Sequence, residues 1–277
     1  MFKKYLIIAS RKDIAGMNIV QSLSQFRPSP FLNISSNKPY FDIYIVEEDT
    51  LHEENLNLDK INKYDFIIFA SKHSTKSEEK RKTLSIHAPG NFRTADLGGV
   101  KGKVCRSSAL FNKALFEKLN EKASEYNFKD YDFTMEATHH GPLIEKPCVF
   151  IEIGSTEMEW KNSRAGFIIA KTIYETINDF EHNPYREISI GIGGNHYCSN
   201  FNNLQLKSNV AFSHIIPQYV MPITEEMILE TINKTIEKFD FLVLDWKHIG
   251  TDEQRSEFTK ILDKNYIPWK RISEVKR

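Results

Sequence analysis

The sequence lacks any apolar run that approaches the roughly 20 residues of a membrane-spanning helix. The short apolar run that begins at Tyr5 meets the charged residue Arg11 too early for a signal peptide, and it predicts a buried strand instead. Cysteine is also scarce: Cys105, Cys148 and Cys198 are far apart and odd in number, which excludes a disulfide framework. We therefore expect a protein of the reducing cytoplasm that does not contact a membrane.

Net charge is absent as well, since 37 Lys and Arg residues balance 37 Asp and Glu residues. A neutral chain is not a general nucleic-acid binder, so any RNA contact has to use a local basic patch. The sequence also contains no dinucleotide fingerprint, no phosphate-binding loop with its lysine and no Gly-x-Ser-x-Gly elbow. These absences leave hydrolysis as the favoured chemistry.

Unbroken apolar runs alternate with stretches of helical spacing along the 277 residues. This pattern predicts a three-layer α/β fold, with a mostly parallel or mixed central sheet and helices on both faces. We find no linker or boundary, so we expect one domain, residues 1–277. The expected strands are 5–10, 41–47, 65–70, 84–87, 133–138, 147–153, 187–192, 209–217 and 241–245, and the expected helices are 14–23, 108–126, 160–180, 224–238 and 252–263.

The most informative stretch follows the expected strand 133–138, where a carboxylate is followed by two adjacent histidines and a Gly-Pro turn. If the strand is regular, Glu136 and Thr138 share a face with His140, and His139 takes the opposite face. A carboxylate beside an imidazole suits general acid–base catalysis or metal ligation. The alternative is that one histidine is packed at the edge of the core and the other is solvated.

Further histidines follow or end other expected strands, namely His73, His87 and His196, and His214 lies within the expected strand 209–217. The ends of parallel strands meet at one edge of a sheet, so we expect these imidazoles to line a single cleft with the His139–His140 pair. A lone histidine inside an apolar strand is usually a hydrogen-bonded core residue, and this is the alternative for His214. The remaining histidines, expected on the surface, are His52, His182 and His248.

Zinc is a possible cofactor, because histidine and glutamate are among its natural ligands. The candidate ligands are His139, His140, His196 and His214, although their spacing matches no known zinc signature. A cysteine nucleophile is a weaker alternative: Cys198 lies near His196, and the other two cysteines are expected to be buried and inert.

Four motifs occur together, at residues 85–92 (SIHAPGNF), 137–142 (ATHHGP), 152–157 (EIGSTE) and 191–197 (GIGGNHY). In this combination the chain resembles the archaeal and plant-type D-aminoacyl-tRNA deacylases, the D-tyrosyl-tRNA deacylase family, over residues 5–269. The resemblance implies an enzyme that hydrolyses the ester between a D-amino acid and the 3′ end of tRNA. It also implies a zinc-associated monomer with a fold similar to those of peptidyl-tRNA hydrolases and purine nucleoside phosphorylases.

On this hypothesis the catalytic residues are Glu136, His87, His139 and His140, with one histidine of the pair activating water directly or through zinc. Backbone N–H groups near Gly90 or Gly193 are expected at the oxyanion or the terminal adenosine, and an aromatic ring is expected to stack on the terminal base. The expected substrate-binding residues are Lys72, His73, Gly90, Asn91, Phe92, Thr138, Glu157, Gly193, Gly194 and Tyr197, and those for tRNA phosphates are Lys72, Lys76, Lys101, Lys103 and Arg106.

Other functions remain open from the sequence. A peptidyl-tRNA hydrolase-like or nucleoside phosphorylase-like enzyme would use a similar architecture, and a non-catalytic module would bind zinc or tRNA without turnover. The tRNA ribose hydroxyl is an alternative source of catalytic assistance. The preference for a D-amino acid rests on the resemblance alone.

Overall fold

The computed structural model describes residues 2–26, 39–53, 56, 58–75 and 80–276, so the expected phosphate contact of Lys76 lies outside the described residues. The strands are β1 Lys4–Ser10, β2 Tyr40–Val46, β3 Phe66–Lys72, β4 Thr83–His87, β5 Gly90–Asn91, β6 Lys103–Val104, β7 Asp132–Met135, β8 Cys148–Gly154, β9 Glu187–Ile192, β10 Val210–Ile216, β11 Phe241–Leu244 and β12 Trp269–Arg271. The helices are α1 Ile14–Leu23, α2 Leu58–Ile61, α3 Ala109–Glu125, α4 Glu157–Trp160, α5 Ser163–Asp179, α6 Ser199–Lys207, α7 Glu225–Lys234 and α8 Asp252–Lys264.

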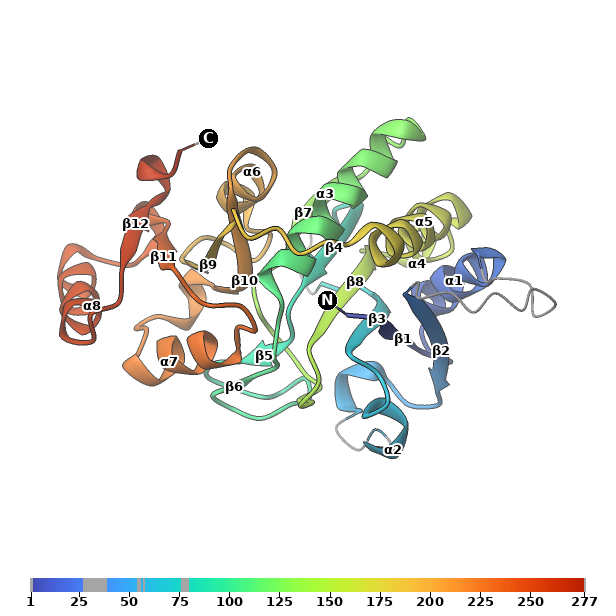
Figure 1. The fold of residues 1–277 in the computed structure, drawn as a ribbon, viewed down its shortest axis with the longest axis horizontal. Coiled ribbons are helices and arrows are strands. Elements are labelled where there is room, and N and C mark those ends of the chain that lie inside the picture. Colours follow the sequence, from blue (N-terminus) through green and yellow to red (C-terminus); the bar gives the residue numbers. More distant parts are fainter. Residues whose placement is uncertain (1, 27–38, 54–55, 57, 76–79, 277) are drawn as a thin grey trace.

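The strands form two larger sheets, and the expectation of one central sheet is wrong. The first sheet has the order β2-β1-β3-β8-β4-β7, and the second has the order β10-β9-β11-β12. Figure 1 shows the second sheet, built from the C-terminal part of the chain, beside the first. The first sheet is mixed because β4 runs antiparallel to β8, whereas the second is parallel throughout. The broader prediction of an α/β protein with mostly parallel strands is confirmed.

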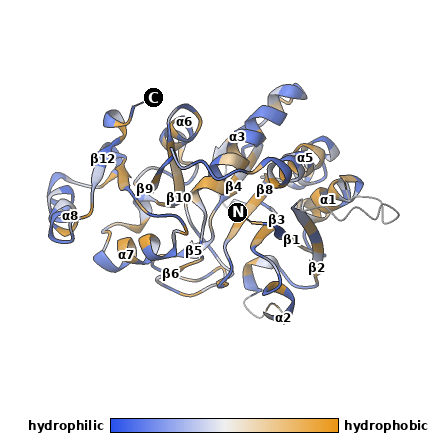
Figure 2. Cartoon of the chain, in the orientation of Figure 1, coloured by the Kyte–Doolittle hydropathy of each residue, from blue (hydrophilic) through white to orange (hydrophobic). Residues whose placement is uncertain are grey.

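The strands of the first sheet carry apolar side chains on both faces. In β1, Tyr5 and Ile7 join the cluster of buried side chains that includes α1, α3 and α5, while Leu6 and Ile8 join a separate cluster on the other face. A strand that is covered on both sides needs no polar alternation, which explains the unbroken apolar run in the sequence. Figure 2 shows this contrast between hydrophobic strands and more hydrophilic outer helix surfaces.

Three local features in the second half of the chain differ from the expectations. The helix expected over 160–180 corresponds to α5 but begins three residues later, because the side chain of Asn162 accepts hydrogen bonds from the N–H groups of Arg164 and Ala165 and begins the helix there. The short helix α4 precedes it and ends at Trp160. Helix α6 and strand β12 were not expected. In α6 only three residues are buried, so its apolar periodicity is weak, and β12 is a three-residue edge strand.

A short segment after β7 joins the two sheets. The N–H of Glu136 donates to Ile86 in the first sheet, while the N–H groups of Ala137 and Thr138 donate to the carbonyl groups of His196 and Ile215 beside or in the second sheet. The largest apolar cluster also contains residues of both sheets. These contacts support the single domain, 1–277, which stays a prediction. Within the described part of the chain, every helix is too short or too polar to span a membrane.

Replacement of Thr138 by Val should weaken the contact between the sheets. The Thr138 hydroxyl accepts a hydrogen bond of 3.1 Å from the N–H of Ile215, and its loss leaves that buried N–H without its partner. We expect the free energy of unfolding to fall by about 1–3 kcal/mol, measured by urea denaturation. The control is Thr172→Val, where the lost hydroxyl donates only to the helical carbonyl of Ile168, and we expect a much smaller change. Equal losses in the two variants would contradict this account.

Candidate functional site

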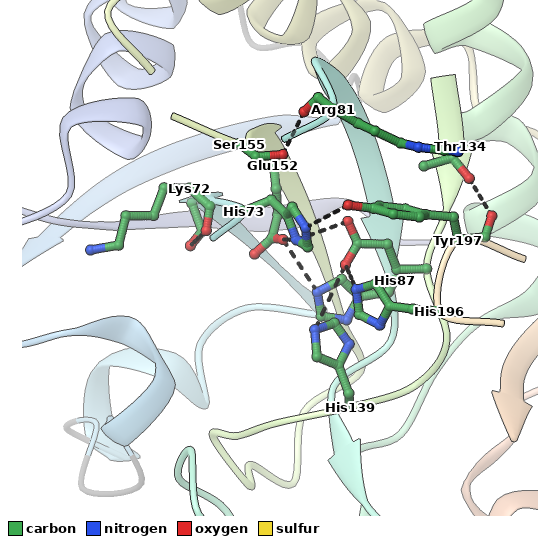
Figure 3. A network of polar contacts seen from close by, with 12 residues as sticks. Lys72, His73, Arg81, His87, Thr134, His139, Glu152, Ser155, His196 and Tyr197 are labelled. Carbon is green, nitrogen blue, oxygen red and sulfur yellow. Dashed lines mark hydrogen bonds and ion pairs between the residues drawn. The ribbon is translucent and has the colours of Figure 1, made fainter. Parts of the chain in front are cut away.

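Seven titratable side chains meet at the junction of the two sheets, and we call them the histidine–carboxylate cluster. His73 follows β3, His87 ends β4, Glu152 lies within β8 and His196 follows β9. The loop after β7 supplies the rest. Figure 3 shows the rings of His73, His87, His139 and His196 gathered together, with Glu152 next to His73 and His87. The members of the cluster are His73, His87, Glu136, His139, His140, Glu152 and His196.

The cluster confirms that histidines distant in sequence come together, but the expected reason was wrong. They do not lie at one parallel edge, because β4 runs antiparallel to β8 and His196 comes from the second sheet. What brings them together is the loop after β7, since the N–H of Ala137 donates to the carbonyl of His196 at 2.8 Å.

Glu136 is at the centre of the cluster, and its side chain is completely buried. Its Oε1 lies 3.1 Å from Nδ1 of His73, and its Oε2 lies 3.0 Å from Nε2 of His196. Nε2 of His139 is 3.7 Å from the same Oε2. The sequence predicted that His140 would share a face with Glu136. That alternation fails because β7 already ends at Met135 and His140 has a left-handed φ of 44°.

Glu152 is the second buried carboxylate, and the sequence analysis missed it. Its Oε2 lies 3.6 Å from Nδ1 of His73 and 3.7 Å from Nε2 of His87. The signal was available, because this residue interrupts the apolar run of β8, and both faces of that strand are buried. A charged residue in such a strand needs a specific partner.

The buried charges shift one another's pKa values. Burial alone lowers the pKa of His73, but Glu136 and Glu152 outweigh that effect and raise it to about 11. Burial raises the pKa of Glu152, and contacts with His73 and His87 reverse this and lower it to about 2. The pKa of Glu136 is lowered in the same way, since His73 and His196 outweigh its burial. Both carboxylates are therefore ionised at neutral pH.

The adjacent His139 and His140 behave differently. Burial and then the neighbouring histidines lower the pKa of His139 well below its usual value, and burial with His87 lowers that of His140 to about 4. Nδ1 of His139 lies 2.8 Å from the carbonyl oxygen of Ala137, and Nδ1 of His140 lies 2.6 Å from that of Gly141. A carbonyl only accepts, so Nδ1 carries the proton and Nε2 keeps its lone pair.

The arrangement has the donor atoms and the geometry to hold a metal ion. Ligand atoms lie within 4.8 Å of one another in three groups: His87–His139–His140, His73–Glu136–His196 and His87–Glu136–Glu152. In the described part of the chain, both Glu136 oxygens, Oε1 of Glu152 and Nε2 of His87 are buried without a hydrogen-bond partner. Three of these atoms, the two Glu136 oxygens and Nε2 of His87, lie at ion-pair distances from neighbouring groups but without hydrogen-bond geometry. Buried carboxylates and imidazole lone pairs in this state fit a bound cation.

His214 lies apart from these groups, so its expected role as a ligand is not supported. Its Nδ1 is 3.2 Å from the Ser213 hydroxyl, and its Nε2 is 3.0 Å from the carbonyl oxygen of Cys105. Both ring nitrogens therefore already have partners, and burial lowers the pKa of His214 to about 4. The alternative of a hydrogen-bonded core histidine fits these contacts.

A cavity of about 360 Å³ opens beside His139 and His140, and we call it the substrate cavity. Part of its wall is formed by Tyr219, which the sequence analysis missed and which is 56% exposed. Arg93 fixes this wall by donating to the carbonyl groups of Val220 and Pro222. The predicted substrate-binding residues that line the cavity are Gly90, Asn91, Phe92 and Thr138.

Several groups that were predicted to bind the substrate already have partners within the protein. The N–H of Gly90 donates to the carbonyl groups of His139 and His140, and that of Gly193 donates to Ile216, so neither is available for an oxyanion. The Tyr197 hydroxyl lies 3.2 Å from Nε2 of His73, which makes it a partner of the cluster.

Other predicted residues lie away from the substrate cavity. Glu157 is exposed and pairs with Lys161, and Figure 3 shows Lys72 extending away from the histidines. Gly194 borders a separate cavity. The basic residues of the neighbouring loop, Lys101, Lys103 and Arg106, are exposed.

The cysteines offer no nucleophile. All three are buried and free, as expected for Cys105 and Cys148. Burial and then the charge of Glu136 raise the pKa of Cys198 well above its usual value, so its thiol stays protonated. The alternative of a cysteine nucleophile is therefore not favoured.

Comparisons with known proteins cover nearly the whole chain. A family model described as D-aminoacyl-tRNA deacylase matches residues 60–270. The D-aminoacyl-tRNA deacylase of Methanocaldococcus jannaschii is 31% identical, with 97% of this chain and 100% of that protein covered. The one from Thermococcus onnurineus is 34% identical, with 93% and 95% covered. The crystal structure of a conserved protein of unknown function, AF0625, has a TM-score of 0.85 at 27% identity, covering 99% of this chain and 96% of that chain.

Replacement of His140 by Ala should weaken metal binding. The variant loses one of three imidazole ligands in the His87–His139–His140 group, and we expect its zinc affinity to fall by on the order of 10–100-fold or more. The measurement is zinc titration of chelator-treated protein, followed by calorimetry and elemental analysis. His214→Gln is the control, because that buried histidine lies outside the groups and its replacement should leave the affinity unchanged. Equal affinities in wild type and His140→Ala would contradict the site.

Proposed function

The chain belongs to the D-aminoacyl-tRNA deacylase family, and we propose that it hydrolyses the ester bond of D-aminoacyl-tRNA at the histidine–carboxylate cluster. The observation that carries this location is the contact between the cluster and the substrate cavity. His139 and His140 belong to the cluster and also line that cavity. An ester held in the cavity therefore lies directly beside the neutral imidazoles, and Oε2 of the ionised Glu136 lies 3.7 Å behind Nε2 of His139.

We propose zinc as the metal, held by His87, His139 and His140. Three imidazole ligands with an open position are typical of catalytic zinc sites. Backbone carbonyl oxygens lie 2.8 Å from Nδ1 of His139 and 2.6 Å from Nδ1 of His140 and orient these two rings. Nδ1 of His87 lies 3.3 Å from the carbonyl oxygen of Ala88. Zinc bound there would supply a Lewis acid that polarises the ester carbonyl.

Glu136 is the proposed acceptor for the proton of the attacking water. It is ionised, because His73 and His196 hold its pKa low, and neither of its oxygens has a hydrogen-bond partner among the described residues. As water attacks the carbonyl carbon, one of its protons moves to Oε2 of Glu136. When the tetrahedral intermediate collapses, the ribose oxygen departs and takes that proton back. His196, 3.0 Å from Oε2, stabilises the carboxylate between the two steps.

The substrate cavity has the size and lining for the aminoacyl end of the tRNA. Its volume of about 360 Å³ lies within the usual range of small-molecule sites, roughly 300–1,000 Å³. Phe92 and Leu97 supply apolar surface, and Tyr219 is exposed enough to stack on the terminal base. Lys101 forms a β-bridge with Asn91 of the cavity wall, and Lys101, Lys103 and Arg106 are exposed and are proposed to contact phosphates, although Lys103 also pairs with Glu230.

We retain three finer proposals. The fold is similar to those of peptidyl-tRNA hydrolases and purine nucleoside phosphorylases. The protein works as a monomer. It resides in the cytoplasm, which the three free buried cysteines support. Among the alternative functions, the family assignment favours the deacylase over a hydrolase of peptidyl-tRNA, a phosphorylase or a non-catalytic module.

Hydrolysis assays with D-Tyr-tRNA and L-Tyr-tRNA test the function directly. We expect the pure protein to hydrolyse the D-ester and not the L-ester. Activity should be lost on chelation and restored by zinc, because bound zinc would supply the Lewis acid for the ester carbonyl. Release of radiolabelled tyrosine measures both reactions. Hydrolysis of neither ester by the zinc-loaded protein would refute the proposed function, and full activity after verified metal removal would refute the role of zinc.

Replacement of Glu136 by Gln separates proton transfer from metal binding. The amide keeps the size of the side chain but cannot accept the proton of water, so we expect kcat to fall by about 10²–10⁴-fold while zinc content stays unchanged. His182→Ala, at an exposed position, is the activity control. If Glu136→Gln keeps more than a tenth of wild-type kcat, assistance by the tRNA ribose hydroxyl becomes the better mechanism. Substrate with a 2′-deoxy terminal nucleoside then tests that mechanism.

A further inference from the structure

The topology of the second sheet identifies a second place where a ligand is expected. All neighbouring strands in the order β10-β9-β11-β12 are parallel. β10 pairs with one side of β9, and β11 pairs with the other side, so the winding direction reverses between β9 and β11. In open parallel sheets, ligands bind outside the carboxyl ends of the strands at such a reversal.

A cavity of about 130 Å³ lies at this reversal, and we call it the switch-point cavity. Each of three strand ends contributes to its wall: Gly194 follows β9, Gln218 follows β10 and Asp245 follows β11. Whole small-molecule sites usually measure roughly 300–1,000 Å³. A cavity of this size therefore suits one group of a larger ligand.

Asp245 determines the chemistry of the switch-point cavity. It is only 5% exposed, and Nδ1 of His248 lies 2.9 Å from its Oδ1. Its Oδ2 accepts a hydrogen bond of 2.7 Å from the Asn200 amide. A carboxylate oxygen has two acceptor positions, so each oxygen can still accept one hydrogen bond. The matching ligand group is a neutral donor such as a hydroxyl, because a phosphate would be repelled by the carboxylate charge.

Gly194 keeps the carboxylate accessible. Its φ is 80°, and a Cβ added there would lie 3.6 Å from Oδ2 of Asp245. The missing side chain thus leaves space in front of this oxygen. A carboxylate that follows a strand and binds a ribose hydroxyl is a recurrent arrangement at the switch points of nucleotide-binding sheets.

The switch-point cavity lies close to the catalytic cluster. Only Asn195 separates Gly194 from His196, so the Cα atoms of Gly194 and His196 are at most about 7.6 Å apart. The consecutive residues Gln218 and Tyr219 line the switch-point cavity and the substrate cavity, respectively. The two cavities therefore flank one short segment, and one polynucleotide end can reach both.

We propose that the switch-point cavity binds a 2′-hydroxyl of one of the last two nucleosides of the tRNA, with Asp245 as the acceptor. This proposal rests on the proposed function, because the tRNA end is its ligand. It assigns Asp245 a role in substrate binding rather than in the chemical step.

The first test compares wild type with Asp245→Asn on D-Tyr-tRNA. We expect KM to rise about tenfold, as for loss of a hydrogen bond to a charged group, with kcat within twofold of wild type. Asp245→Glu is a second variant: it keeps the charge that Asn200 and His248 contact, but displaces it by one methylene, and KM should also rise. The matched control is Asp240→Asn at the other end of β11, where the carboxylate accepts from the N–H of Ile188, and its KM should match wild type.

The second test replaces each of the two terminal 2′-hydroxyl groups by hydrogen in turn. At one position the replacement should raise KM for wild type about tenfold and have no further effect on Asp245→Asn. Equal effects on both enzymes at both positions, or an unchanged KM for Asp245→Asn, would overturn the proposal. Affinity for uncharged tRNA, measured by fluorescence titration of the same variants, decides the role of Asp245 even if the wild type hydrolyses neither ester. Failure of the proposed function is thus distinguishable from failure of this inference.

Discussion

The site depends on one electrostatic constraint, the burial of two carboxylates in the middle of the protein. Glu136 and Glu152 are each almost fully buried, and a buried charge is costly unless opposite charge lies close to it. In the described structure, imidazoles from both sheets supply this opposite charge. His73 is the most important of them, because it contacts both carboxylates. The same demand explains why the cluster suits a cation, since four buried atoms in it have no hydrogen-bond partner.

Much of the fold could be predicted from the sequence, because long apolar runs and helical spacing are local signals. Strands such as β1 and β8 and helices such as α3 lie within two residues of their expected bounds. The division into two sheets could not be predicted, because it depends on pairing between distant strands. β4 reverses direction against β8, and no local pattern encodes that choice. Helix α6 was missed because few of its residues are buried.

The sequence predicted which residues form the site better than it predicted how they are arranged. The sequence identified six of the seven residues of the cluster, but it paired Glu136 with His140 instead of His139. That pairing assumed a regular strand, whereas β7 stops early and His140 adopts a left-handed conformation. Glu152 was missed because it resembles an ordinary strand residue until the burial of both faces is known. One partner of His214, the carbonyl of Cys105, is distant in sequence, so that contact could not be foreseen.

The hydrogen bonds of the loop after β7 have a consequence for synthesis of the chain on the ribosome. The hydroxyl of Thr138 pairs with a residue 77 positions later, and the neighbouring N–H pairs with His196. Translation proceeds from the N-terminus at about 5–20 residues per second, so these partners emerge seconds after the loop. A nascent chain that ends before His196 contains four of the five cluster histidines but lacks the segment that joins the loop to the second sheet. The proposed catalytic cluster is therefore completed only after most of the chain has been synthesised.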